Sequence, residues 1–218
     1  MAIWAWIVDP QLAAPLSVVC SLAGQLATIR SARAGFSFRR VLPFIIGGAI
    51  GVPLGTLVVP YLDQTYFRLG LGVFLAVWCP FMFFDHLLPR VEGEQRLADG
   101  AIGMAGGIMG GLGGLAGAMP TLWSLQRGWD KDARRSVVQS FNLSMHVLTV
   151  TAYLGSGLIT SKELPWFALA IPAMLVPALL GARLYQRISD AQFRRIVLVM
   201  LFGSGIALLA SALPKLLA

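Results

Sequence analysis

Four polar side chains recur at helical spacing along an otherwise apolar segment, residues 133–155. Three or four residues separate each from the next, so they share one face of a helix: Gln139, Asn142, His146 and Thr149. A histidine kept within a membrane is a functional candidate by default, and side-chain amides are hydrogen-bond donors. Polar residues also join neighbouring helices, which is how we interpret the Ser and Thr residues here and in a weaker series, Ser17, Ser21, Gln25 and Thr28. We interpret the two amides and the histidine as candidate ligand-binding groups.

A glycine-rich stretch, GGIMGGLGGLAGAMPT at 106–121, interrupts the apolar sequence. Seven of the twelve residues from Gly106 to Gly117 are glycine. Glycines recur every four residues through the flank 103–111, and this spacing lets membrane helices approach closely. A nucleotide-binding loop is excluded, because no strand precedes the stretch and it lacks the GK[ST] or acidic partner of such loops.

For the centre of the stretch we favour a functional interpretation. Gly111–Gly117 would break the helix at mid-membrane, and Ala118–Met119–Pro120 would begin a new half-helix, since proline suits a first turn. The first amides of that half-helix lie at the positive end of its dipole, which suits an anion. Backbone exposed at this depth is tolerated only where it lines an enclosed or watery cavity. The predicted substrate-binding residues are therefore Gly113, Gly114, Gly117, Pro120, Thr121, Gln139, Asn142 and His146.

The remaining reactive residues argue against other kinds of chemistry. All ten acidic residues lie at the ends of apolar runs or between them, whereas cation carriers normally keep a carboxylate at mid-membrane. A hydrolase is disfavoured, because Ser140 and Ser144 point away from the helix face of His146 and no GxSxG or HExxH motif is present. We therefore expect an anion path in a protein that is not an enzyme, with no metal and no cofactor.

The composition indicates an integral membrane protein. Of the 218 residues, 57% are hydrophobic and 12% are charged, against roughly 25% charged residues in soluble domains. The net charge of +7 comes from basic residues in short loops, so we expect no nucleic-acid binding. Because a membrane helix needs about 20 mostly apolar residues, we predict an all-α protein with six spans, at 10–30, 41–61, 66–86, 133–155, 164–183 and 190–214.

Segment 97–127 does not fit a straight span. As one helix it would be about 46 Å long, against a hydrocarbon core of roughly 30 Å. If it crossed the membrane, the basic residues would divide almost evenly between the two sides. If it returns to its starting side, fourteen of the seventeen gather on one side and the other keeps Arg68, Lys162 and Lys215. That asymmetry is typical of a positive cytoplasmic side, so we predict a re-entrant glycine-rich hairpin.

The chain also carries an internal repeat. A shift of 126 residues superposes 54–68 on 180–194, and both copies run from a span through a polar turn to Phe-Arg and a second span. With the hairpin topology the copies are inverted, as is common in transporters. We predict a single membrane domain over 1–218, with repeat 1 at 1–96 and repeat 2 at 97–218. Repeat 1 would lack a counterpart of the hairpin, either because the true start lies upstream or because that hairpin has been lost.

The stretch GGIMGGLGGLAGAMPTLWSLQRGWDKDARRSVVQSFNLSMH at 106–146 resembles the second-half signature of the TauE/SafE family of sulfite exporters. The similar features are the glycine-rich break, a proline shortly after it, RGW, the charged DKDARR turn and the Q-x-F-N start of the next helix. The duplication resembles the two-half design of that family. The resemblance implies a multi-pass permease in the bacterial inner membrane for small sulfur-containing anions, such as sulfite or organosulfonates.

Two functional hypotheses follow. The first is the permease, whose partners would be a small anion and the lipid bilayer, with His146 as a candidate proton carrier because imidazole titrates near neutral pH. The second is a membrane assembly or interaction subunit without transport activity. An assembly subunit would show glycines that pack helices but no row of polar side chains along one helix face.

Overall fold

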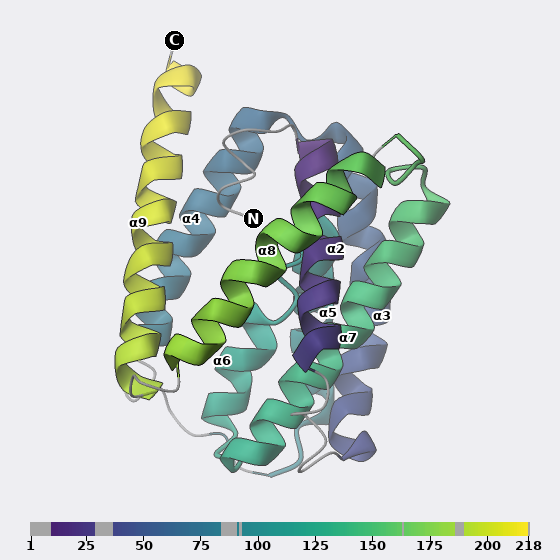
Figure 1. The fold of residues 1–218 in the computed structure, drawn as a ribbon. Helices are drawn as coiled ribbons and strands as arrows, with labels where there is room; N and C mark the ends of the chain where they lie inside the picture. The colour runs from purple at the N-terminus through teal and green to yellow at the C-terminus, as the bar shows by residue number, and fades with distance from the viewer. Residues whose placement is uncertain are drawn as a thin grey trace.

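The computed structural model describes residues 10–28, 37–83, 91, 93–162, 164–185 and 190–217. All regular structure in these ranges is helical, which confirms the predicted all-α class. The α-helices, shown in Figure 1, are α2 (Pro10–Thr28), α3 (Phe38–Val58), α4 (Gln64–Phe83), α5 (Arg96–Gly113), α6 (Ala118–Gln126), α7 (Lys131–Gly155), α8 (Leu164–Tyr185) and α9 (Asp190–Leu217). A 3-10 turn, η2 (Val59–Tyr61), continues α3.

Each apolar run identified in the sequence coincides with one helix, and segment 97–127 divides into α5 and α6. The predicted ends at residues 30 and 86 lie outside the described residues. Three described stretches are long and apolar enough to cross a membrane, namely Phe38–Tyr61, Gln64–Phe83 and Arg195–Leu213. Two shorter apolar helices are Gln11–Ala27 and Leu164–Val176. Helix α7 has the length of a span, but the polar residues along one face make it less apolar.

Helices α3 and α5 pack backbone against backbone through two rows of glycine. A Cβ on Gly51 of α3 would overlap the carbonyl oxygen of Met104, and a Cβ on Gly107 of α5 would overlap that of Gly48. The same close approach recurs at Gly47, Gly55, Gly103 and Gly111. The glycine spacing at 103–111 therefore does pack helices, as one of the two sequence interpretations held. The matching row on α3 was not anticipated.

The chain folds back on itself between α5 and α6. The N–H of Val91, before α5, donates to the carbonyl of Gln126, at the end of α6, over 2.9 Å. The Arg127 guanidinium donates to the Gly93 carbonyl. The two ends of the segment 97–127 therefore meet at one end of the molecule.

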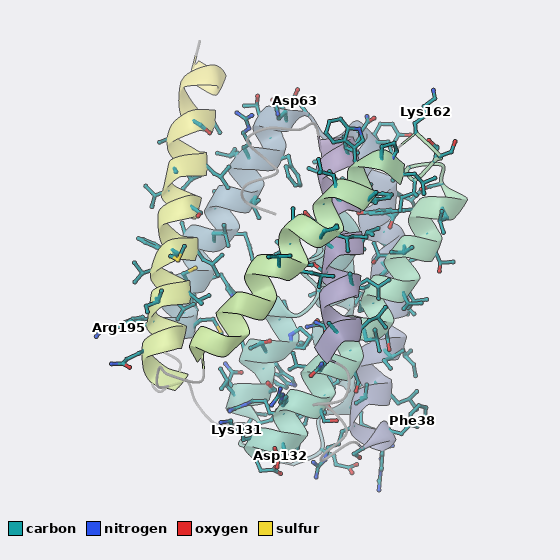
Figure 2. The ribbon with its side chains drawn as sticks, in the orientation of Figure 1. Phe38, Asp63, Lys131, Asp132, Lys162 and Arg195 are labelled. Carbon is teal, nitrogen blue, oxygen red and sulfur yellow. The ribbon has the colours of Figure 1, made fainter. Side chains whose placement is uncertain are left out.

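That end of the molecule is rich in arginine and lysine. In Figure 2, Phe38, Lys131 and Asp132 lie at one end of the helix bundle, and Asp63 and Lys162 lie at the opposite end. Seven basic residues at or near the first of these ends belong to α3, α5, α7 and the turn before α7: Arg39, Arg40, Arg96, Arg127, Lys131, Arg134 and Arg135. We call it the basic end.

Helix α7 is held by its apolar face, which leaves its polar face free to line a site. Val137, Phe141 and Met145 are fully buried in one core with Phe44 of α3. The Phe44 and Phe141 rings meet edge to face, with their centroids 6.3 Å apart. The polar residues between these apolar positions, such as Gln139 and Asn142, face α2, α5 and α6.

Candidate functional site

Helix α5 ends at a position that requires glycine. Gly114 has a φ of +79°, in the left-handed region, and its N–H donates to the Gly110 carbonyl over 2.8 Å. The hydroxyl of Tyr153, from α7, donates to the carbonyl of Gly111. A helix end leaves its last carbonyls unpaired, and α7 supplies a partner for one of them. The end of α5 is thus anchored to α7.

The start of α6 lies against the side-chain amide of Asn142. A Cβ on Gly117 would be 2.5 Å from Nδ2 and 2.6 Å from Oδ1 of Asn142. The φ of Gly117 is −74°, so glycine is needed here for space and not for backbone conformation. The Gly117 carbonyl accepts from the N–H of Thr121 over 3.0 Å and from its hydroxyl over 2.6 Å. These bonds fix the Thr121 side chain beside the break.

Two backbone donors at the start of α6 have no acceptor within the described part of the chain. Among the residues that the structure describes, the N–H groups of Gly117 and Met119 make no hydrogen bond, whereas that of Ala118 donates to the Leu115 carbonyl over 3.3 Å. Pro120, which is buried, has no N–H to leave unpaired. Because the first turn of a helix carries a partial positive charge, these two donors are suited to an anion.

Behind Asn142, a row of buried polar atoms is unpaired within the described part of the chain. They are Oδ1 of Asn142, Nε2 of His146 and Oγ1 of Thr149. The His146 ring is nearly enclosed, with Nδ1 2.5 Å from the Asn142 carbonyl and the Gly114 backbone beside it. Most buried polar groups in proteins have a partner. Unpaired atoms on successive turns of one helix face therefore mark a place for water or a ligand.

The first turn of α7 is fixed by an N-cap. The Asp130 carboxylate accepts from the N–H of Ala133 over 2.8 Å. This hydrogen bond holds the pKa of Asp130 below its ordinary range, and the charge of Arg40 contributes in the same direction. The cap sets where the helix begins, and so sets the face on which its first basic residues lie.

A cavity of about 610 Å³ joins those basic residues to Asn142. Three cations of α7, Lys131, Arg134 and Arg135, line its part near the basic end, and no acidic residue lines it within the described chain. Such a surface attracts and concentrates anions. The other lining residues come from α2, α4, α6 and α7: Gln25, Met82, Thr121, Leu125, Val138, Gln139 and Asn142.

The structure gathers most of the predicted site residues around this cavity, with one exception. Thr121, Gln139 and Asn142 line it, and the glycine break and His146 lie directly behind Asn142. Gly113 instead lines a separate apolar pocket beside α4, with residues such as Phe67. The described residues around it there are almost all apolar, and Tyr66 adds one hydroxyl.

Sequence reasoning missed the three cations of the cavity. Lys131, Arg134 and Arg135 served there as markers of membrane topology and as part of the DKDARR turn, and not as candidate binding residues. A signal was present, because Lys131, Arg135, Gln139 and Asn142 follow one another at intervals of four, four and three residues, which places them along one helix face.

Comparison with known proteins identifies the family of the chain. A search of curated proteins and a search of solved structures each found no match. A family model described as sulfite exporter TauE/SafE matches residues 1–208 of the 218. The chain therefore belongs to the TauE/SafE family of sulfite exporters, which are membrane transporters of sulfite-type anions.

Proposed function

We propose that this protein is a permease that moves sulfite or organosulfonates across the bacterial inner membrane. One observation carries the proposal: a cavity lined by three cations leads to Asn142, and Asn142 lies against the start of α6. In this proposal the anion enters at the basic end and binds where α6 begins.

The cations of the cavity would attract the anion without holding it. Lys131, Arg134 and Arg135 belong to the first two turns of α7, whereas Asn142 lies about halfway along that helix. A line of positive side chains raises the local concentration of anions. A transport site must also release its ion, so binding must be favourable yet weak enough to reverse. Neutral donors at the inner end meet that need better than a direct ion pair.

The inner site would bind the anion through amide groups. Gly117 and Met119 offer backbone N–H groups, and Asn142 offers Nδ2. Gln139 lines the approach one turn earlier on α7. In a site shielded from water, oriented dipoles of this kind stabilise charge strongly because their field is little screened.

The proposed topology has six spans and a re-entrant hairpin formed by α5 and α6. It is supported by the pairing of Val91 with Gln126, which brings both ends of the hairpin to the basic end. It is also supported by the contact of Gly117 with Asn142, at mid-length of α7. Asp63, in the first repeat copy, lies at the top of the bundle in Figure 2, whereas α9, which begins within the second copy, starts at the lower left in Figure 1, which favours inverted repeats.

In the same proposal His146 carries a proton with the anion. Its Nε2 is buried and has no hydrogen-bond partner among the described residues, and its ring lies between the Asn142 carbonyl and the backbone at the break. Protonation there would place a positive charge next to the bound anion, and so couple the two ions electrostatically.

Reconstitution tests the proposal. Purified protein in proteoliposomes is expected to take up radiolabelled sulfite or a labelled sulfonate by exchange with the same anion inside, at a rate above that of protein-free vesicles. Chloride exchange serves as the comparison. Absence of exchange for both sulfur anions, in folded protein, would contradict the proposal and favour a subunit without transport activity.

A further inference from the structure

A second basic cavity lies at the same end of the molecule. Its volume is about 430 Å³, and four arginines line it together with Trp129: Arg39, Arg40, Arg96 and Arg127. It shares no lining residue with the cavity that leads to Asn142. The transport proposal therefore leaves it unassigned.

The carboxylates of this cavity do not balance its arginines. Glu94 bridges Arg39 and Arg96, over 3.3 Å and 3.0 Å. Asp99 accepts from the Trp123 indole N–H over 2.6 Å and faces Arg127. Glu94 and Asp99 are the two acidic residues of the lining, so four cations face two anions and the described lining carries a net charge of +2.

Two of the arginines have donors to spare. Arg40 forms no ion pair among the described residues, and its guanidinium lies 6.0 Å from the centre of the Trp129 ring. The Arg127 side chain is only 7% exposed, and its Nε has no hydrogen-bond partner in the described chain and lies 3.9 Å from Asp99. Arg40 is exposed to solvent, whereas the buried Arg127 donor without an acceptor is costly. An acceptor supplied from outside the chain would remove that cost.

We infer that this cavity binds a phosphate group, either free or at the head of an anionic lipid. Guanidinium groups match the oxygens of a tetrahedral oxyanion through paired N–H donors. A phosphate dianion would also neutralise the +2 of the lining. At the basic end of a membrane protein, lipid headgroups and soluble phosphate both reach such a cavity.

Thermal unfolding measures the binding of free phosphate. The detergent-solubilised protein is titrated with sodium phosphate, and with sodium chloride at matched ionic strength. Phosphate is expected to raise the unfolding temperature in a saturable way, and chloride is not. Arg40→Gln should weaken the apparent phosphate affinity about tenfold, the usual effect of losing one charge-assisted hydrogen bond. Glu94→Gln should strengthen it, because it removes a negative charge and frees two arginines.

Two control variants separate this cavity from general charge effects and from the transport path. Arg195→Gln removes one cation from α9, where Arg195 lies over the Phe83 ring outside both cavities, and should leave phosphate affinity unchanged. Asn142→Leu alters the transport cavity and should leave it unchanged as well. The inference is overturned if Arg40→Gln and Glu94→Gln bind phosphate with the affinity of the parent protein. It is also overturned if either control lowers the phosphate affinity as much as Arg40→Gln does.

Lipid nanodiscs identify the source of the phosphate. In discs of phosphatidylcholine the stabilisation by free phosphate should persist if the ligand is soluble. Adding phosphatidic acid should stabilise the parent protein more than Arg40→Gln, and should abolish the response to free phosphate, if the ligand is a headgroup. If neither free phosphate nor phosphatidic acid stabilises the parent protein, the cavity is not a phosphate site. All these readouts are of binding, so they stand or fall separately from sulfite transport.

Discussion

The side-chain amide of Asn142 occupies the space that a Cβ on Gly117 would fill. Its Nδ2 and Oδ1 lie 2.5 Å and 2.6 Å from that hypothetical carbon. The contact joins α7, which carries Gln139, Asn142 and His146, to Gly117, the residue directly before α6. The backbone N–H groups without an acceptor in the described chain lie at this start of α6. The glycine at 117 therefore allows a side-chain amide and a helix N-terminus to lie next to each other.

Gly117→Ala should impair transport while the fold survives. The backbone conformation of Gly117 accepts alanine, but the added methyl group must displace the Asn142 amide. Because a small misplacement of a binding group is costly, we expect sulfite exchange in proteoliposomes to fall about tenfold or more. Gly203→Ala on α9 is the matched control, since a Cβ there meets open space. If both variants exchange sulfite at the same rate, Asn142 does not belong to the anion site.

Asn142→Leu should separate binding from stability. The variant loses the Nδ2 donor, so sulfite affinity should weaken by about 1–3 kcal/mol. The unfolding temperature should not fall, because Oδ1 is buried with no partner among the described residues and leucine removes that atom. Isothermal titration calorimetry and thermal unfolding measure the two effects. Thr151→Ala, an exposed hydroxyl of α7, is the control. A loss of stability without a loss of affinity would indicate a purely structural asparagine.

Neutralising the cavity cations should slow transport in a salt-dependent way. In the triple variant Lys131→Gln, Arg134→Gln, Arg135→Gln, initial exchange rates should fall severalfold at low ionic strength. The difference from the parent protein should shrink toward about 1 M salt, where the screening length falls to about 3 Å. Arg195→Gln, which removes one cation outside the cavity, is compared with each of the three single variants as a control for lost charge. A defect that is the same at every ionic strength would mean that these residues do not attract the anion electrostatically.

Cysteine labelling tests the hairpin topology. The native Cys20 and Cys79 are buried and would first be replaced by alanine. Cysteines at the exposed positions Gln95 and Lys131, before and after the hairpin, should react with an impermeant maleimide from the cytoplasmic side. A cysteine at Lys162 should react from the opposite side. If the first two positions label from different sides, the α5–α6 segment crosses the membrane and the inverted-repeat proposal fails.

Asp130 should make the stability of the protein depend on acidic pH. Its folded pKa is lowered by the hydrogen bond from Ala133, so its contribution is complete above the ordinary carboxyl pKa of about 3.9 and is lost as pH falls through the lowered value. Asp130→Ser keeps a capping oxygen but does not titrate, and should flatten this part of the curve of unfolding temperature against pH. Asp132→Ser, two residues later, removes the same charge without removing the cap. An unchanged curve in Asp130→Ser would contradict the role of the cap.

The amino-acid sequence determined the features that depend on neighbours along the chain. Apolar runs of about 20 residues bounded by charges specified the helices, and the glycines before Pro120 specified where α5 ends and α6 begins. The spacing of Gln139, Asn142 and His146 placed them on one face, because helical periodicity is local. The family signature at 106–146 is local for the same reason.

Only the tertiary structure decided which of these features meet. The glycine row of α5 fits a row on α3 far away in sequence, and no local pattern specifies that register. Gly113 points to the apolar pocket beside α4, while Gly117, four residues later, meets Asn142. The three cations at the start of α7 line the same cavity as Asn142 because α2, α4 and α6 close around them. Such contacts depend on how the helices pack against one another over long range. A single sequence does not reveal how far each helix is rotated about its axis or shifted along it.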